Sequence, residues 1–285
     1  MTAGTSGGEA SRPRVLLTND DGVRAPGLRA AFDALAPHAD VTVVAPVDQR
    51  SGASHQITLE SPLRAHRLSD LPGWMVDFTP VDCVKLALGQ LLPVRPDLVV
   101  SGINRGSNAG NLAHYSGTVA AAKEAVLAGV PAVAFSLCGW DAPDFEAAAR
   151  VVAALVPRVL ARPLPPRTLL NVNVPRRPWS ELKGLRWCRQ SQRPLGDAYE
   201  ARRDPRGAAY YWLSGEPVPA RGAPDDDFEA ISEGWVAVTP LTVDWTAEAL
   251  WRDGGAAWLD EPQEGPSGAP SGAPSGAVDR PPARS

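Results

Sequence analysis

Two adjacent carboxylates follow the first apolar segment of the chain and are the residues best suited to chemistry. Residues 15–19 (VLLTN) run directly into Asp20, Asp21 and Gly22. A continuous Val/Leu run is typical of a parallel strand buried on both faces, and open α/β sheets bind ligands beyond the carboxyl ends of such strands. Because adjacent carboxylates repel each other unless a cation joins them, the position indicates a cation site. The alternative interpretation is a solvated loop with an Asx turn.

Three further polar segments follow predicted strands or open a predicted helix, at residues 45–54, 101–108 and 115–118. Each also has an ordinary structural interpretation. Ser51 suits a turn, Asn104 a left-handed turn position, and Ser116 or Thr118 a helix N-cap. Strands of one parallel sheet end at the same edge, however, so their polar residues are expected to meet there.

The side chains expected at that edge offer only oxygen ligands: Asp20, Asp21, Ser51 and Asn104. Hard oxygen donors suit Mg²⁺, Mn²⁺ or Ca²⁺ and disfavour zinc. Two carboxylates neutralise a divalent ion, so such a site would not repel a phosphate. A helix that begins near Ser116 would present free amide hydrogens and a positive dipole end to an anion. Both aspartates can reach one ion only if the strand ends near Asn19, since neighbouring residues of a strand face opposite sides.

The elements that must position these residues alternate between strand and helix. Strands are expected at 14–18, 41–45, 97–101, 130–135 and 168–174, and helices at 26–36, 79–91, 120–128 and 143–160, with short extended pieces at 56–78. This alternation predicts an α/β fold with a parallel, doubly wound sheet. Residues 210–213 and 235–239 indicate antiparallel strands of a smaller subdomain or an oligomerisation extension.

Composition narrows the class of protein. The chain has 285 residues and a net charge of −4; with no basic bias, binding to a nucleic-acid polymer is not expected. Cys83, Cys138 and Cys188 lack metal-site or disulfide spacing and are expected to be free thiols. The sequence contains no apolar run of about 18 residues, the length that a membrane span needs. Residues 1–14 lack the apolar core of a signal peptide. A cytoplasmic location without membrane association is the expectation.

The chain is predicted to divide into four parts. They are a disordered N-terminal extension (1–13), a catalytic core (14–180), a C-terminal extension that packs on the core and oligomerises (181–255), and a disordered tail rich in Pro, Ser, Gly and Ala (256–285). Such a tail buries too little apolar surface to offset the entropy of ordering.

Together these motifs resemble the SurE family, the survival-protein-E nucleotidases. The matching segments are TNDDG (18–22), APG (25–27), RSG (50–52), SGINRGSN (101–108), YSGTVAAA (115–122), YYW (210–212) and GWVAVTPL (234–241). The resemblance covers residues 14 to 246. It implies a Rossmann-like, three-layer core with exchanged C-terminal elements in a homodimer or homotetramer. It further implies a divalent-metal-dependent phosphomonoesterase that hydrolyses nucleoside 5′-monophosphates, with some 3′-nucleotide and short-chain polyphosphate activity.

The resemblance also assigns roles to residues. Its metal ligands fall on Asp20, Asp21, Ser51 and Asn104, for one divalent ion (Mg²⁺ or Mn²⁺, with Ca²⁺ as a substitute in crystals). Its phosphate-facing residues fall on Asn108, Ser116, Gly117 and Thr118. We expect direct hydrolysis by metal-activated water, with Asp20, Asp21 and Asn104 as catalytic residues. Lys123 and Trp235 depart from the residues common in the family but lie outside these assignments.

Two other classes are weighed against this one. A haloacid-dehalogenase-type phosphatase would need two carboxylates separated by one residue, whereas Asp20 and Asp21 are adjacent. A non-catalytic nucleotide-binding module would be marked by loss of a metal ligand, and all are present. Elsewhere, the four histidines lack the spacing of metal ligands, and His114 is the only one considered for substrate contact. Asp225 to Asp227 are interpreted as a solvated helix start rather than a second metal site.

Overall fold

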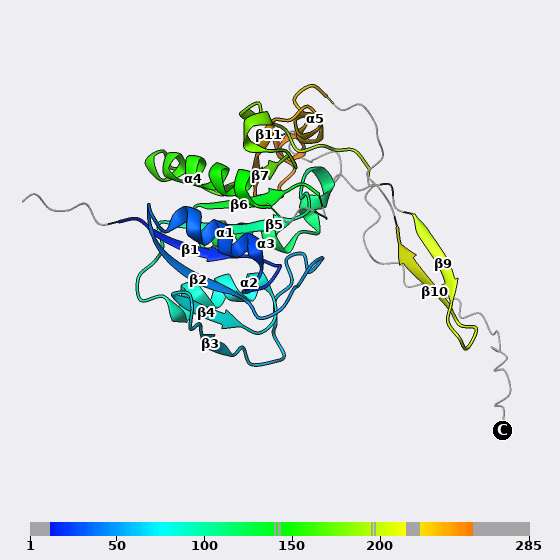
Figure 1. Cartoon of the computed structure of the whole chain (residues 1–285), viewed down its shortest axis with the longest axis horizontal. Coiled ribbons are helices and arrows are strands. Elements are labelled where there is room, and N and C mark those ends of the chain that lie inside the picture. Colours follow the sequence, from blue (N-terminus) through cyan, green and yellow to red (C-terminus); the bar gives the residue numbers. More distant parts are fainter. Residues whose placement is uncertain are drawn as a thin grey trace, which may run out of the picture. The chain divides into compact units, whose positions relative to one another are not determined.

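A nine-stranded sheet organises the computed structural model, which describes residues 12–139, 141, 144–194, 196, 198–214 and 223–252 (Figure 1). The strand order is β3-β4-β2-β1-β5-β6-β7-β11-β8. The chain separates into two units, Met1–Val243, which holds this sheet, and Asp244–Ser285, which holds the short helix α6 (Glu248–Arg252). The segments predicted to be disordered, 1–13 and 256–285, lie outside the described residues except for Arg12 and Pro13.

Most neighbouring strands of the sheet are parallel. The parallel set is β1 (Arg14–Thr18), β2 (Asp40–Pro46), β4 (Gly73–Val76), β5 (Leu98–Arg105), β6 (Ala132–Leu137) and β7 (Thr168–Val174). The short strand β3 (Ala65–Arg67) runs antiparallel to β4 at one edge. The predicted α/β class with a parallel-rich sheet is confirmed.

Helices cover both faces of this sheet, so the core has three layers. On one face α1 (Pro26–Leu35) and α4 (Glu146–Ala161) pack over a cluster that includes Leu17. On the other face α2 (Pro80–Leu86) and α3 (Gly117–Leu127) pack over a cluster that includes Leu16. Adjacent leucines of one strand thus serve opposite faces, because side chains alternate along a strand.

Helix ends follow the local sequence signals. Thr79 accepts a hydrogen bond from the Asp82 amide while Asp82 bonds back to the Thr79 amide, which completes a capping box. Pro80 occupies the first turn, where its missing amide hydrogen costs nothing. α2 continues as a π-helical turn (Ala87–Leu91), so helical structure reaches the predicted residue 91.

The strand β5 differs from the prediction, which ended it at Ser101. It continues to Arg105, with a register shift between Ser101 and Asn104. Gly102 makes this possible: its φ is +125°, and a Cβ there would lie 2.3 Å from the Phe135 carbonyl oxygen. Asn104 consequently lies within the strand, paired with Ser136 of β6, and not in the loop that follows.

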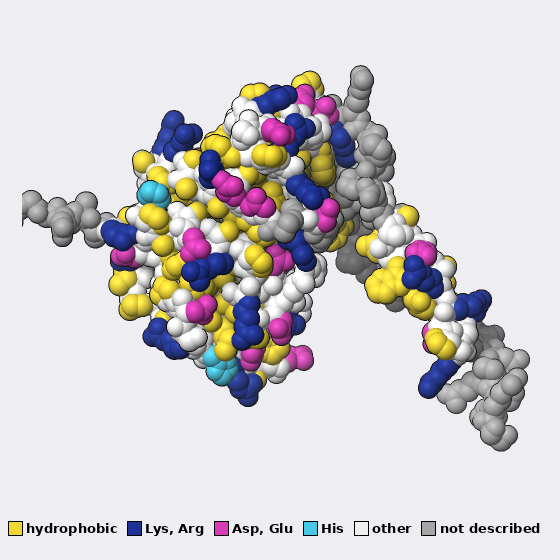
Figure 2. Space-filling model, in the orientation of Figure 1, with side chains coloured by type: hydrophobic (Ala, Val, Ile, Leu, Met, Phe, Trp, Pro, Cys, Tyr) yellow, Lys and Arg dark blue, Asp and Glu magenta, His cyan; other side chains and the backbone are white. Residues whose placement is uncertain are grey.

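The C-terminal strands separate into two groups. β9 (Tyr199–Arg203) and β10 (Ala209–Leu213) form an antiparallel hairpin in which every side chain is exposed, many of them hydrophobic (Figures 1 and 2). β11 (Val236–Thr242) instead joins the central sheet, antiparallel to β7 and parallel to β8 (Leu185–Trp187). The strand predicted at 235–239 exists, but the expectation that it belongs to a smaller subdomain is wrong, because β7 offers it a full pairing edge. None of the described helices is long and apolar enough to cross a membrane.

Candidate active site at the carboxyl edge of the sheet

Asp20 lies at the end of β1 against the first turn of α3. Its side chain is only 4% exposed, and the Thr118 hydroxyl donates a hydrogen bond to its Oδ1. Gly117 is in contact from the same turn: a Cβ there would lie 2.9 Å from the Asp20 Cβ and 3.0 Å from its Oδ2. Desolvation raises the Asp20 pKa to about 6, a shift that the Thr118 hydrogen bond opposes and the Asp21 charge increases.

Asp21 is joined to the end of β5. The Arg105 backbone amide donates to its Oδ2 at 3.0 Å, and burial raises the pKa of this carboxyl. The turn that allows both aspartates to face the edge is formed at Asn19 and Gly22, where the Asn19 side-chain amide donates to the Gly22 carbonyl at 2.9 Å and Gly22 has φ +98°. The predicted end of the strand near Asn19 is confirmed, since β1 stops at Thr18.

Asn104 and Ser51 approach this edge from β5 and from the loop after β2. Asn104 is 7% exposed, and its side-chain amide donates to the Gly106 carbonyl at 2.9 Å. The Ser51 loop is tied to the site through its neighbour, because the Arg50 amide donates to the Asp20 carbonyl at 2.7 Å. Ser51 itself is exposed, and its Oγ accepts from the Gln49 side chain at 2.8 Å. The structure therefore connects Asp20 and Asp21 to β5 and α3 directly, and the Ser51 loop to Asp20 through the backbone.

The Ser51 loop is also fastened to the segment before α3. Ser54 donates from its amide to the Tyr115 carbonyl at 3.2 Å and from its hydroxyl to the His114 carbonyl at 2.8 Å. His55 contacts Glu124 of α3 at 2.9 Å, and Lys85 of α2 contacts the other oxygen of Glu124 at 3.0 Å. The sequence did not indicate a role for His55 or Glu124, because these residues contribute to the site only by holding the loop that carries Ser51.

The start of α3 presents backbone amides without a helical partner close to the carboxylates. Ser116 is the N-cap, and its hydroxyl oxygen accepts from the Val119 amide at 3.1 Å. Residues Gly117 and Thr118 occupy the first turn, before the first amide that the helix itself satisfies. From the sequence we expect an N-cap at Ser116 or Thr118, and in the structure Ser116 occupies that position.

Asn108 is held on the other side by asparagines that the sequence analysis did not single out. Its amide donates to Asn173 Oδ1 at 2.8 Å, its carbonyl accepts from the Asn171 side chain at 2.8 Å, and its own side chain donates to Ser136 Oγ at 2.8 Å. The signal was present in β7, where Asn171 and Asn173 alternate with apolar residues and so project to one face.

Where the structure describes the chain, most of the buried polar atoms that lack a hydrogen-bond partner lie on strands of the central sheet or directly after them. Among the described residues, buried side-chain atoms without a hydrogen-bond partner are Thr18 Oγ1, Asn19 Oδ1, Ser101 Oγ, Asn171 Oδ1, Asn173 Nδ2, Thr239 Oγ1 and Arg193 Nε. Thr18 pairs with Ser101 across β1 and β5, and Asn171 with Thr239 across β7 and β11. Buried polar groups are normally satisfied, so these atoms are available to a bound water or ligand.

The donor chemistry of the edge fits a hard divalent cation. Asp20 and Asp21 are two carboxylates whose pKa values burial raises, and a bound cation would reverse that cost. Asn104 and Ser51 add neutral oxygens, which Mg²⁺ and Mn²⁺ accept. No cluster of three or more His, Cys, Asp or Glu side chains suited to a metal occurs in the described part of the chain. The donor set at this edge, two carboxylates with neutral oxygens, is of the kind that Mg²⁺ prefers.

Other residues weighed from the sequence have structural roles. Asp226 caps α5 (Asp227–Ser232), as a helix start requires, but Asp226 and Asp227 are buried, so the expectation of a solvated run is wrong for both. His114 is exposed and contacts the Gln190 side chain at 3.2 Å. The three cysteines are free and buried, as expected.

Residues 15–197 match the family model described as Survival protein SurE. A protein of Methylococcus capsulatus named 5′-nucleotidase SurE is 49% identical over 247 residues, covering 86% of this chain and 97% of that protein. One of Heliobacterium modesticaldum with the same name is 42% identical over 254 residues, covering 86% and 93%. The crystal structure of the SurE protein from Aquifex aeolicus superposes with a TM-score of 0.78 at 38% identity, covering 87% of this chain and all of that one.

Proposed function

Because the chain belongs to the survival protein SurE family, we propose that it is a 5′-nucleotidase, an enzyme that hydrolyses nucleoside 5′-monophosphates to nucleoside and phosphate. One observation in the structure carries this proposal. The carboxylate of Asp20 lies directly on the first turn of α3, through Thr118 and Gly117. A group that binds a cation and a group that binds an anion are thus joined at one point, which suits a phosphate ester.

The metal requirement is part of the proposal. We assign one divalent ion, Mg²⁺ or Mn²⁺, to Asp20, Asp21, Asn104 and Ser51. The support is the pair of buried carboxylates with raised pKa values and the all-oxygen donor set. When bound, such an ion lowers the pKa of a coordinated water and neutralises phosphoryl oxygens.

The side chains of the site have separate roles in orienting the water and in binding the phosphate. Asp20 is the group that orients the attacking water and accepts its proton, since it is the more enclosed carboxylate. The α3 amide end and the Ser116 hydroxyl hold the phosphate in line for displacement. Asn104 and Asn108 each use one side-chain N–H on a protein acceptor; an amide has two such hydrogens, so each retains one for a phosphate oxygen.

The proposal also covers additional substrates, the oligomeric state and the location of the protein. Activity on 3′-nucleotides and short-chain polyphosphates would use the same phosphate contacts. A homodimer or homotetramer would cover the exposed aromatic side chains of β9 and β10. A cytoplasmic location remains a prediction.

Phosphate release from a panel of nucleoside 5′- and 3′-monophosphates tests the function. The full chain is assayed with Mg²⁺, with Mn²⁺ and with excess EDTA. We expect hydrolysis of 5′-monophosphates that EDTA abolishes and either ion restores. Equal activity with and without EDTA would contradict the metal assignment, and failure to hydrolyse any nucleotide under all three conditions would contradict the function itself.

A further inference from the structure

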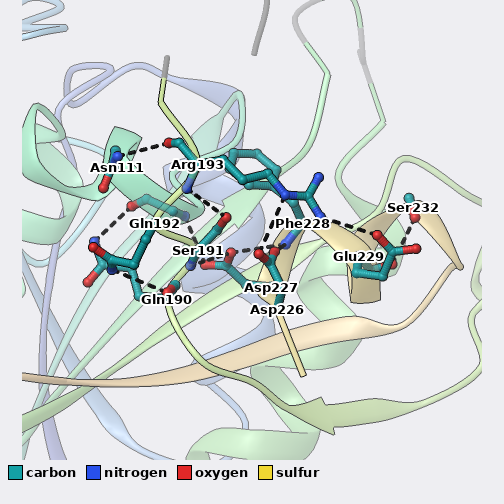
Figure 3. A network of polar contacts seen from close by, with 11 residues as sticks. Asn111, Gln190, Ser191, Gln192, Arg193, Asp226, Asp227, Phe228, Glu229 and Ser232 are labelled. Atoms are coloured by element: carbon teal, nitrogen blue, oxygen red, sulfur yellow. Dashed lines mark hydrogen bonds and ion pairs between the residues drawn. The ribbon is translucent and has the colours of Figure 1, made fainter. Parts of the chain in front are cut away.

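A buried carboxylate outside the proposed metal site holds the loop that leads into α3. Asp227 is completely buried. Its Oδ2 accepts from the Gly110 amide at 2.8 Å, and its Oδ1 accepts from the Ser191 amide at 3.1 Å and the Phe228 amide at 2.9 Å. One side chain thus joins backbone amides of three separate segments (Figure 3).

The first of these segments is the one on which phosphate binding depends. Residues 105–118 connect the end of β5 to the first turn of α3 and carry Asn108 and Ser116. The sheet fixes this stretch through Asn108, as described above. Gly110, two residues further on, is fixed by Asp227 and by the Gln190 side chain, which donates to the Gly110 carbonyl at 3.0 Å.

The fit at Gly110 is close enough to be specific. Gly110 has φ +52°, and a Cβ there would lie 2.5 Å from Cε2 of the Phe228 ring. The side chain of the next residue, Asn111, donates to the Arg193 carbonyl at 2.9 Å. The loop is therefore held at Gly110 and Asn111 by residues 190–193 and 227–228; Figure 3 shows the Asn111 contact with Arg193.

The other two segments form the base of the β9–β10 hairpin. The chain leaves the sheet region at Arg189 and Ser191 and returns at Asp225 to Asp227. Arg189 and Asp226 form a β-bridge, the Arg189 amide donates to the Asp225 carbonyl at 2.7 Å, and the Asp227 amide donates to the Arg189 carbonyl at 3.0 Å. Asp227 is the side chain shared by this base and the phosphate-side loop.

We propose that Asp227 is a positioning residue, which fixes the phosphate-side loop at Gly110 and couples that loop to the base of the hairpin. The proposal rests on the proposed function, because it concerns the same phosphate contacts. Burial raises the Asp227 pKa, while the Gly110 and Ser191 amides lower it, in keeping with a carboxyl group retained at a desolvation cost for its three hydrogen bonds.

The variant Asp227→Asn separates the two connections. Its single carbonyl oxygen can still accept from the Ser191 and Phe228 amides, but its amide nitrogen would then face the Gly110 amide and lose that bond. Asp225→Asn is the matched control, since it removes the same charge from a neighbouring side chain that is 57% exposed and whose carboxylate lies 3.8 Å from the Arg189 side chain. The backbone bond between the Asp225 carbonyl and the Arg189 amide is kept in this variant. Asp227→Ala removes all three bonds.

We expect Asp227→Asn to raise KM for the nucleotide and the inhibition constant of inorganic phosphate about tenfold, with kcat and Mn²⁺ dependence within about threefold of wild type. Backbone hydrogen exchange should accelerate over residues 107–117 and stay unchanged over residues 14–22. Asp225→Asn should match wild type in every measurement. Asp227→Ala should raise KM, the phosphate inhibition constant and the exchange rate over residues 107–117 more than Asp227→Asn does.

A lower kcat with unchanged KM and phosphate inhibition would indicate only a smaller folded fraction and would overturn the proposal. Unchanged exchange over 107–117 would overturn it as well, and that measurement also decides the case if a variant folds incompletely or the wild type is inactive. An inactive wild type contradicts the proposed function separately, because hydrogen exchange does not depend on catalysis.

Discussion

The carboxyl edge of the sheet buries charge, whereas the β9–β10 hairpin exposes apolar surface. Asp20 is 4% exposed at the edge, while Tyr211 and Trp212 on the hairpin are 65% and 58% exposed. Burying a carboxylate costs free energy unless a positive charge compensates, and leaving large aromatics in water costs free energy unless another surface covers them. Stability alone therefore explains neither region, whereas the proposed metal site and the proposed subunit interface would each offset the cost.

The largest effect is expected from the carboxylates. Asp20→Asn and Asp21→Asn should each reduce phosphate release by roughly 10²–10³-fold, the usual loss when one electrostatic stabiliser of a transition state is removed. Circular dichroism should show an intact fold, because the amide is isosteric. Undiminished activity in both variants would remove the basis for calling this edge catalytic.

The hairpin is tested by Tyr211→Ser combined with Trp212→Ser, which should convert an oligomer to smaller species. Aromatic anchors contribute about 2 kcal/mol or more each to an interface, so the dissociation constant should rise by at least ~100-fold. Light scattering of the full chain measures this, with exposed Arg202→Ser as the control. A wild-type monomer at micromolar concentration would refute the assignment. Truncation after Val174 is a poor substitute, since it also removes β11 from the sheet.

A third experiment uses the pH dependence of stability without metal. The folded state raises the Asp20 pKa from 3.8 to about 6, so the native protein binds the proton more tightly than the unfolded chain. The free energy of unfolding of the metal-free protein should therefore fall as pH rises from about 4 to 6, by roughly 3 kcal/mol for a shift of about two units. The raised pKa of Asp21 acts in the same direction.

Asp20→Asn should abolish most of this fall in the free energy of unfolding between about pH 4 and 6. In EDTA it should be more stable than wild type at pH 7 and equally stable near pH 4, and added Mn²⁺ should stabilise only the wild type. Denaturant unfolding at several pH values measures both effects. Identical pH profiles for the two proteins would show that Asp20 is not the desolvated group.

The smallest effect is expected at the loop that carries Ser51. His55→Ala removes the contact with Glu124 and should cost about 1 kcal/mol of loop stability, raising the Mg²⁺ concentration for half-maximal activity several-fold at unchanged oligomeric state. His66→Ala, on the exposed strand β3, is the control. An unchanged Mg²⁺ requirement would mean that the Ser51 loop does not depend on this tether.

The sequence predicted the elements well because their signals are local. Buried parallel strands appear as continuous apolar runs, and the pair Thr79 and Pro80 predicts a helix start. The end of β5 was missed because it depends on how Gly102 packs against a neighbouring strand. The pairing of β11 with β7 was not predicted, because the two strands lie far apart in the sequence.

The candidate site shows the same division. Asp20 and Asn104 could be singled out because polar residues that follow a run of apolar residues are visible in one sequence. Asp227 could not, since three consecutive aspartates look solvated; the amides of Gly110 and Ser191, which bury it, come from distant segments. Residue type is local information, while burial is set by the fold.

The antiparallel strand β11 has a consequence for synthesis of the protein on the ribosome. β7 is complete at Val174, but the strand that pairs with its outer edge begins at Val236, about 60 residues later. At ~5–20 residues per second, the outer edge of β7 waits roughly 3–12 s for its partner. During that interval its backbone N–H and C=O groups are open to strands of other nascent chains. Ribosomes closely spaced on one messenger would raise that risk, and slower decoding of residues 175–235 would prolong it.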